Sequence, residues 1–282
     1  MAQFEYDTLL VDTVDEVSTI TFNRPEARNA MNPQFHFDMR DALKDVAADN
    51  DTRVVVLTGS AGSWIAGMDL KQFFYEGFKN PRGMADAGEA AGVWNRSLRY
   101  MPKPTIAMVN GYVFGAAFSV LCACDIAVAD EEALLGLPEI NWGIAPGGNL
   151  LFDIPEMMPF RDMLWMALSG ENITGKQAAD MRFVNFAVPQ AELKNKVLDI
   201  AENLKKKAPE ALQSTKLGAR LSLKMDREHQ GAFIMALSGQ AGRSADARGT
   251  GGTTRALEQF MDKKYRPAFG EYDWQTEESN PR

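Results

Sequence analysis

Two glycine-bearing loops are the parts of this sequence whose residue types could do chemistry. They run from Thr58 to Leu70 and from Val109 to Ser119, and each follows a short apolar segment. Small residues where a strand passes into a helix leave backbone N–H groups without partners. Two such groups aimed at one point would stabilise an oxyanion, and a single donor of this kind contributes ~3–4 kcal/mol to catalysis. The alternative is that both loops are tight turns whose glycines serve conformation alone.

Other signatures of chemistry are missing from the sequence. Neither loop contains GxGxxG with an acid about 20 residues further on, or GK followed by Ser or Thr, so we expect no dinucleotide-binding or phosphate-binding loop. Ser119 lies in no GxSxG elbow, which argues against an acyl-transfer nucleophile. The two histidines, His36 and His229, and the two cysteines, Cys122 and Cys124, lack the spacing of metal ligands, so we expect no metal site.

Composition describes a globular chain of one large domain or two small ones. Its 282 residues are 45% hydrophobic and 24% charged, and 38 acidic against 30 basic residues give a net charge of −8. This balance provides no general attraction to nucleic acid or to an anionic membrane. The N-terminus has no basic segment of a signal peptide, and no apolar run reaches the ~18 residues of a membrane span. We therefore expect a soluble cytoplasmic protein with two buried thiols.

The elements that must position the two loops alternate between strand and helix. The pattern predicts strands at 9–11, 17–22, 53–59, 105–111, 125–129 and 184–188, and a helix at 33–48. Strands that alternate with helices indicate an α/β fold. Helices are predicted after these strands, at 191–207, 209–223, 227–242 and 253–263. We expect a core domain over residues 1–205 and a C-terminal helical module over 206–282 that packs on a partner surface.

Four motifs in this order resemble the enoyl-CoA hydratase/isomerase (crotonase) superfamily. They are Asn23-Arg24-Pro25 with Asn29-Ala30, the run Ala66 to Leu70, the run Lys103 to Gly111 and the run Pro138 to Ile144. The resemblance covers about residues 16–260. Within the superfamily, the segments 67–71, 118–119 and 139–144 are similar to the hydroxycinnamoyl-CoA (feruloyl-CoA) hydratase-lyases.

The resemblance implies a crotonase-like spiral of β-β-α units with a C-terminal helical module that forms trimers, often paired into hexamers. It implies that the N–H groups of Met68 and Ala116 bind the thioester oxygen of an acyl-CoA. Family members commonly have three glycines where this chain has Gly115, Ala116 and Ala117. A positive φ at position 116 would therefore strain this chain.

The same resemblance identifies Glu139 as the acid–base residue. Ordinary hydratases of the superfamily have a second glutamate where this chain has Ser119, whereas the hydratase-lyases share the single glutamate and the serine. Glu139 would activate a water that adds to the β-carbon, and retro-aldol cleavage would then release an aromatic aldehyde of the vanillin type and acetyl-CoA. A carboxylate beside Trp142 in an apolar pocket would have a raised pKa.

The resemblance also implies two sets of binding residues, and no cofactor beyond the CoA that the substrate carries. The CoA-binding set is Arg28, Ala30, Ala66, Asp69, Leu70 and Lys71. The acyl-pocket set is Phe73, Tyr75, Tyr112, Gly115, Trp142 and Gly147. The two bases Arg28 and Lys71 could equally be solvated surface residues. Two tyrosines that grip the phenol in the hydratase-lyases are missing here, one at Phe73 and one near residues 233–235, and the neighbouring Tyr75 and Tyr112 could compensate for them.

Two other functions remain open at this point. One is a plain hydratase or isomerase acting on another acyl-CoA. The other is a catalytically idle acyl-CoA-binding protein that kept the trimer. The partners expected are an acyl-CoA thioester and further copies of the chain.

Overall fold

The structure is a computed structural model that describes residues 5–222, 224–247 and 260–262. Contacts within the chain divide it into two compact units. The first consists of the residues up to Met101 together with Thr105–Asp199, and the second of Pro102–Pro104 and the chain from Ile200 onward. All the site residues named above belong to the first unit.

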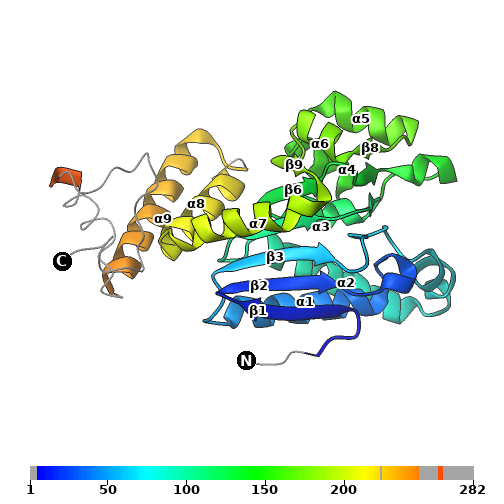
Figure 1. The fold of residues 1–282 in the computed structure, drawn as a ribbon, viewed down its shortest axis with the longest axis horizontal. Helices are drawn as coiled ribbons and strands as arrows, with labels where there is room; N and C mark the ends of the chain where they lie inside the picture. Colours follow the sequence, from blue (N-terminus) through cyan, green and yellow to red (C-terminus); the bar gives the residue numbers. More distant parts are fainter. Residues whose placement is uncertain (1–4, 223, 248–259, 263–282) are drawn as a thin grey trace. The chain divides into compact units, whose positions relative to one another are not determined.

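The first unit is built on a six-stranded sheet in the order β1-β2-β3-β4-β6-β9 (Figure 1). Its strands are β1 (Leu9–Val14), β2 (Val17–Phe22), β3 (Val54–Gly59), β4 (Thr105–Val109), β6 (Ile126–Asp130) and β9 (Phe186–Val188). β1 and β2 are antiparallel, because Asp15 and Glu16 form a two-residue turn with φ of 48° and 63°. The later strands pair in parallel, which confirms the predicted α/β class.

A second, three-stranded sheet in the order β5-β7-β8 was not predicted. Its strands are β5 (Val113–Phe114), β7 (Leu134–Gly136) and β8 (Ile173–Thr174). β5 belongs to the second glycine-bearing loop, and β7 ends just before the segment that carries Glu139. Because β5 and β7 pair in parallel, this small sheet brings the two segments together.

Helices connect the strands of the first unit. The α-helices are α1 (Pro33–Ala48), α2 (Pro81–Arg99), α3 (Ala117–Ala123), α4 (Leu150–Asp153), α5 (Phe160–Ser169), α6 (Gly175–Asp180) and α7 (Gln190–Lys205), the last of which continues into the second unit. The short helices are η1 (Pro25–Ala27), the π-helical η2 (Leu70–Tyr75), η3 (Gly77–Lys79), η4 (Pro138–Trp142) and η5 (Ile154–Glu156). α1 has the predicted bounds, and its predicted stripe of Phe35, Met39, Ala42 and Val46 is buried. α2 was not predicted.

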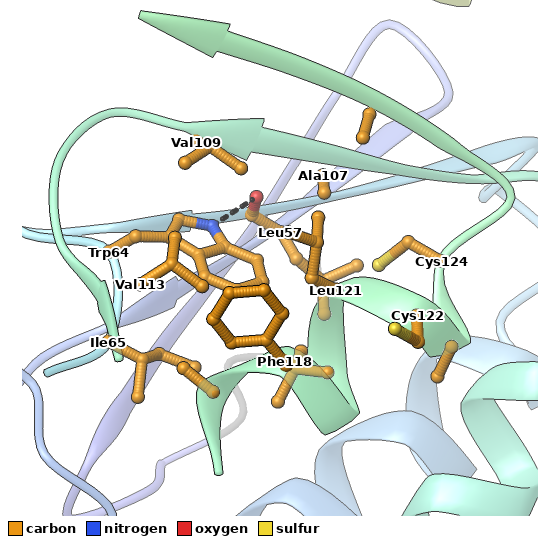
Figure 2. Packing of buried hydrophobic residues seen from close by; sticks show 14 of the residues in the cluster. Leu57, Trp64, Ile65, Ala107, Val109, Val113, Phe118, Leu121, Cys122 and Cys124 are labelled. Carbon is orange, nitrogen blue, oxygen red and sulfur yellow. Dashed lines mark hydrogen bonds between the residues drawn. The ribbon is translucent and has the colours of Figure 1, made fainter. Parts of the chain in front are cut away.

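One hydrophobic core holds the glycine-bearing loops against the sheet. All six residues of β3 are buried, as its apolar sequence indicates for a strand covered on both faces. Trp64, from the first loop, is fully buried and donates its indole N–H to the Leu57 carbonyl at 3.2 Å (Figure 2). Phe118, from the second loop, belongs to the same cluster, as do both cysteines. Each loop is thus anchored by a large aromatic side chain.

The second unit contains α8 (Pro209–Ser222) and α9 (Arg227–Ala247), which pack on each other. Gly218 permits their close approach, since a Cβ there would lie 2.8 Å from the Ile234 side chain. The helix predicted at 253–263 lies outside the described residues except for 260–262. Over the part of the chain that the structure describes, no helix is long and apolar enough to cross a membrane.

Candidate active site

The two glycine-bearing loops lie side by side. Ile65 donates its N–H to the Tyr112 carbonyl at 2.8 Å, and the Phe114 N–H donates to the Ile65 carbonyl at 3.2 Å. The backbones approach so closely that a Cβ on Gly67 would lie 3.0 Å from the Phe114 carbonyl oxygen. Gly67 also has a φ of +90°, which favours glycine. Both loops therefore use glycine for conformation, and that conformation brings them together.

The N–H of Met68 is turned away from the neighbouring backbone. The Met31 N–H donates to the Gly67 carbonyl, and the Met31 carbonyl accepts the Asp69 N–H, both at 2.8 Å. In an extended segment the residue between two such partners points its own N–H to the opposite side. Among the described residues, the Met68 N–H has no hydrogen-bond acceptor.

Ala116 presents the second N–H without strain. Its φ of −58° is ordinary for alanine, and the positive φ of +51° falls on the preceding Gly115. Ala116 directly precedes α3, where the first N–H groups of a helix have no partner within it. No acceptor for the Ala116 N–H is found in the described part of the chain. The alanine in place of a family glycine is therefore compatible with a donor at this position.

Glu139 lies directly over the second loop. A Cβ on Gly115 would be 2.7 Å from the Glu139 Oε1, so a larger residue there would displace this carboxylate. The small sheet produces this arrangement, since the Gly115 N–H donates to the Gly136 carbonyl at 3.0 Å, three residues before Glu139. The pairing of these two backbone segments thus places the Glu139 carboxylate near the Ala116 amide.

The Glu139 carboxylate is electrostatically suited to proton transfer. Its Oε2 is buried and has no hydrogen-bond partner among the described residues. Burial raises its pKa above the usual 4.5, and a backbone hydrogen bond opposes this only in part. A carboxyl group with a raised pKa both accepts and returns a proton more readily near neutral pH. Trp142, expected beside it, is itself 67% exposed.

Ser119 lies on the first turn of α3, where its hydroxyl donates to the Ala116 carbonyl at 2.7 Å. The hydroxyl hydrogen is therefore engaged, and the oxygen can still accept a hydrogen bond. The same hydrogen bond helps to fix the backbone of Ala116, whose N–H is the expected oxyanion donor.

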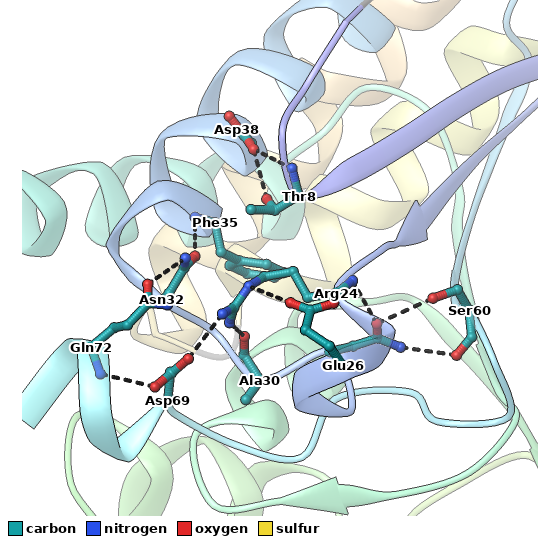
Figure 3. A network of polar contacts seen from close by, with 11 residues as sticks. Thr8, Arg24, Glu26, Ala30, Asn32, Phe35, Asp38, Ser60, Asp69 and Gln72 are labelled. Carbon is teal, nitrogen blue, oxygen red and sulfur yellow. Dashed lines mark hydrogen bonds and ion pairs between the residues drawn. The ribbon is translucent and has the colours of Figure 1, made fainter.

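Two of the residues expected to bind CoA, Ala30 and Asp69, contact the buried side chain of Arg24 (Figure 3). Arg24, only 8% exposed, contacts the Asp69 Oδ2 at 2.9 Å and donates to the Ala30 carbonyl. The other oxygen of Asp69 accepts the N–H groups of Lys71 and Gln72 at 3.1 and 2.9 Å. Asp69 thus holds the loop that carries Met68. Sequence analysis had given Arg24 no role in the site.

The two bases of the expected CoA site are at the surface. The Arg28 guanidinium lies over the Tyr112 ring, 5.4 Å from its centroid. The Arg28 carbonyl accepts the Ala66 N–H at 3.1 Å, which joins two of the predicted CoA-binding segments. The Lys71 side chain is 79% exposed and lies 3.9 Å from Glu76. Their contact with CoA stays a prediction.

The residues expected to form the acyl pocket are less closely assembled. Phe73 lies on η2 and contacts the His36 ring, with the centroids 6.0 Å apart. Tyr112 stacks on Phe114, with the centroids 5.5 Å apart. Tyr75 is 68% exposed, and Trp142 and Gly147 are also exposed. In this chain, Phe73, Tyr112 and Gly115 are thus the more enclosed members of the set.

His36 is a buried polar residue that sequence analysis assigned to no site. Its side chain is 3% exposed, and Nδ1 accepts the Trp94 indole N–H at 3.1 Å. The two rings are stacked, 6.2 Å apart and 8° from parallel. Burial lowers the pKa of His36 from 6.5 to about 4. The imidazole is therefore neutral at physiological pH.

The lowered pKa makes stability depend on pH. Between about pH 4 and 6.5 the unfolded chain binds a proton at this position and the folded protein does not, so acid favours unfolding. We expect the free energy of unfolding to fall by up to about 3 kcal/mol over this window. Urea unfolding at pH 5, 6 and 7 measures the slope, and His36→Gln, which does not titrate, should flatten it. An equal slope in both proteins would contradict the assignment.

Comparison with known proteins finds relatives that match most of the chain. The family model described as enoyl-CoA hydratase/isomerase matches residues 12–270. The hydroxycinnamoyl-CoA hydratase-lyase of Pseudomonas fluorescens is 37% identical over 270 residues, 95% of this chain and 97% of that protein. The 2,3-dehydroadipyl-CoA hydratase of Escherichia coli K12 is 34% identical over 225 residues, 76% and 82% of the two chains.

Solved structures show the same fold. An enoyl-CoA hydratase from Bacillus anthracis superposes with a TM-score of 0.79 at 25% identity, covering 92% of this chain and 97% of that one. An enoyl-CoA hydratase from Mycobacterium tuberculosis H37Rv gives a TM-score of 0.76 at 28% identity, covering 91% and 96%. These findings confirm the predicted crotonase-like fold.

Proposed function

Because the chain belongs to the enoyl-CoA hydratase/isomerase family, whose enzymes act on acyl-CoA thioesters, we propose that it is a hydroxycinnamoyl-CoA hydratase-lyase. The observation that supports this most is the half-buried Glu139 carboxylate, whose Oε2 has no hydrogen-bond partner among the described residues and which packs on the loop that presents the Ala116 amide. Ser119 occupies the position of the second glutamate of ordinary hydratases. The 37% identity to a hydratase-lyase over nearly the whole chain points the same way.

The first stage is hydration of the conjugated thioester. Glu139 takes a proton from water as the oxygen adds to the β-carbon, and the electron pair of the double bond moves onto the thioester oxygen. The N–H groups of Met68 and Ala116 stabilise the resulting enolate, which carries more charge than the ground-state carbonyl. Glu139 then returns the proton to the α-carbon. Ser119 accepts a hydrogen bond from the water and holds it for attack.

The second stage breaks the bond between the α- and β-carbons. Glu139, again ionised, takes the proton of the β-hydroxyl, and the β-carbon leaves as an aromatic aldehyde. The electrons of the broken bond return to the thioester as the enolate of acetyl-CoA, held by the same two amides. Protonation of the α-carbon by Glu139 completes acetyl-CoA and restores the carboxylate. One carboxylate and one oxyanion site thus serve both stages.

The proposal also assigns binding and assembly. CoA is held by Arg28, Ala30, Ala66, Asp69, Leu70 and Lys71, largely through backbone groups, which suits a chain with a net charge of −8. No cofactor takes part beyond the CoA of the substrate. The second unit assembles the chain into a trimer or hexamer, and Ile234 and Met235 on α9, 40% and 76% exposed, are apolar surface available for this contact.

Product analysis tests the proposal directly. Incubation with 4-hydroxycinnamoyl-CoA or feruloyl-CoA is expected to bleach the conjugated thioester absorbance and to yield one aldehyde per acetyl-CoA. Hydration of crotonyl-CoA without any aldehyde from the aromatic esters would identify a plain hydratase instead. Binding of CoA esters with no turnover of any of them would identify an idle binding protein.

A further inference from the structure

The Nε2 of His36 is a buried polar atom whose partner is missing. Tryptophan can only donate, so the Trp94 N–H at Nδ1 places the imidazole hydrogen on Nε2. Among the described residues this N–H has no acceptor, although His36 is only 3% exposed. An unmet donor in the interior costs free energy that an apolar side chain of similar shape would avoid. The unmatched N–H therefore marks this position as a candidate contact for a bound molecule.

The position of His36 connects it to the substrate site. Its ring packs edge-on against Phe73, at 68° between the planes, on η2. η2 begins directly after the loop that carries Met68. Asn32 joins the same two elements, since it caps α1 and donates to the Gln72 side chain at 2.9 Å. His36 is thus held beside the segment where the acyl group of the proposed substrate would extend.

The chemistry around His36 favours an aromatic ring that carries an oxygen. Trp94 stacks on the imidazole, and Phe73 and Phe35 pack against it at 68° and 89°. These faces are flat and apolar, and the imidazole is a neutral donor. Position 73 is where the hydroxycinnamoyl-CoA hydratase-lyases carry a tyrosine that grips the phenol. Here position 73 is a phenylalanine, and its ring contacts that of His36, whose Nε2–H is a donor.

We propose that His36 is a substrate-binding residue whose Nε2–H donates to the para-oxygen of the aromatic acyl group, in place of the missing tyrosine. The inference rests on the proposed function for the location of the acyl group. It assigns specificity for a ring oxygen to a residue on α1, outside the catalytic loops.

Binding measured without turnover separates this inference from the proposed function. In the Glu139→Gln background, calorimetry compares the Kd of 4-hydroxycinnamoyl-CoA with that of cinnamoyl-CoA, and we expect about tenfold tighter binding of the hydroxylated ester. His36→Phe in that background should bring the two Kd values within about twofold of each other. Met39→Leu, a buried change one turn along α1, should leave the preference intact. An unchanged preference in His36→Phe, or an equal loss for both esters, would overturn the inference.

A spectroscopic measurement on the protein with His36 intact tests the same contact if the His36→Phe variant folds poorly. The chain has only two histidines, so the ¹⁵N signals of His36 are readily distinguished from those of His229. In the Glu139→Gln protein, the Nε2 resonance should shift with 4-hydroxycinnamoyl-CoA and stay in place with cinnamoyl-CoA; identical spectra would reject the contact. If the enzyme with Glu139 intact releases no aldehyde but the binding preference persists, the lyase reaction is rejected and the inference about His36 stands.

Discussion

Replacement of Glu139 by glutamine is expected to lower kcat by about 10³-fold, because one group performs the proton transfers of both stages. Glutamine fills the same space over Gly115 but cannot accept the proton of water or of the β-hydroxyl. The oxyanion donors are backbone groups that the change leaves in place. The substitution should therefore lower kcat and change the Kd of the CoA ester by only a few fold.

Aldehyde release and ester binding, measured on the same preparation, check this prediction. Glu132→Gln is a matched control, since Glu132 is an exposed acid seven positions earlier and should tolerate the change. In the unaltered enzyme the acid limb of kcat/KM should lie above pH 4.5, because partial burial raises the pKa of Glu139, which must be ionised to act. Retention of a tenth of the activity in Glu139→Gln would remove this residue from the mechanism.

Local signals made much of the fold predictable. The helix at Pro33–Ala48 follows an asparagine that accepts the Phe35 N–H, and a proline stands at its first position. β3 is apolar throughout because both its faces are covered. α2 begins with the same two signals, since Asn80 accepts the Gly83 N–H and Pro81 stands at its first position, but the prediction missed it. Its three glycines, Gly83, Gly88 and Gly92, lower its helix propensity. Tertiary packing rather than propensity supports that helix.

The assembly of the site depends on contacts between distant residues, which no local pattern contains. The small sheet that brings Glu139 to Gly115 has strands of two or three residues, too short for a period-two signal. Arg24 and Asp69 form their ion pair across 45 positions. The unmet N–H of His36 arises only because Trp94, 58 positions away, fixes the tautomer. The motifs indicate which residues are candidates for reaction, whereas folding sets their environment.

Removal of the Ala116 N–H by Ala116→Pro is expected to lower kcat/KM by about 10²–10³-fold, the usual loss for one oxyanion donor. The backbone suits this test, because the φ of −58° is one that proline adopts. Ala116 precedes the first residue of α3, so no hydrogen bond within the helix is lost. The principal chemical change is the loss of the donor.

Ala116→Gly isolates that loss, since it keeps the N–H and should retain activity within a few fold. Because the proline ring also occupies space beside the missing hydrogen, the Kd of the ester in the Glu139→Gln background and the thermal midpoint are measured for both variants. A large fall in kcat with binding and stability retained in Ala116→Pro indicates a donor used in the transition state rather than in the ground state. Near-normal kcat in the proline variant would mean that the enolate is stabilised elsewhere, and Met68 would lose its expected partner.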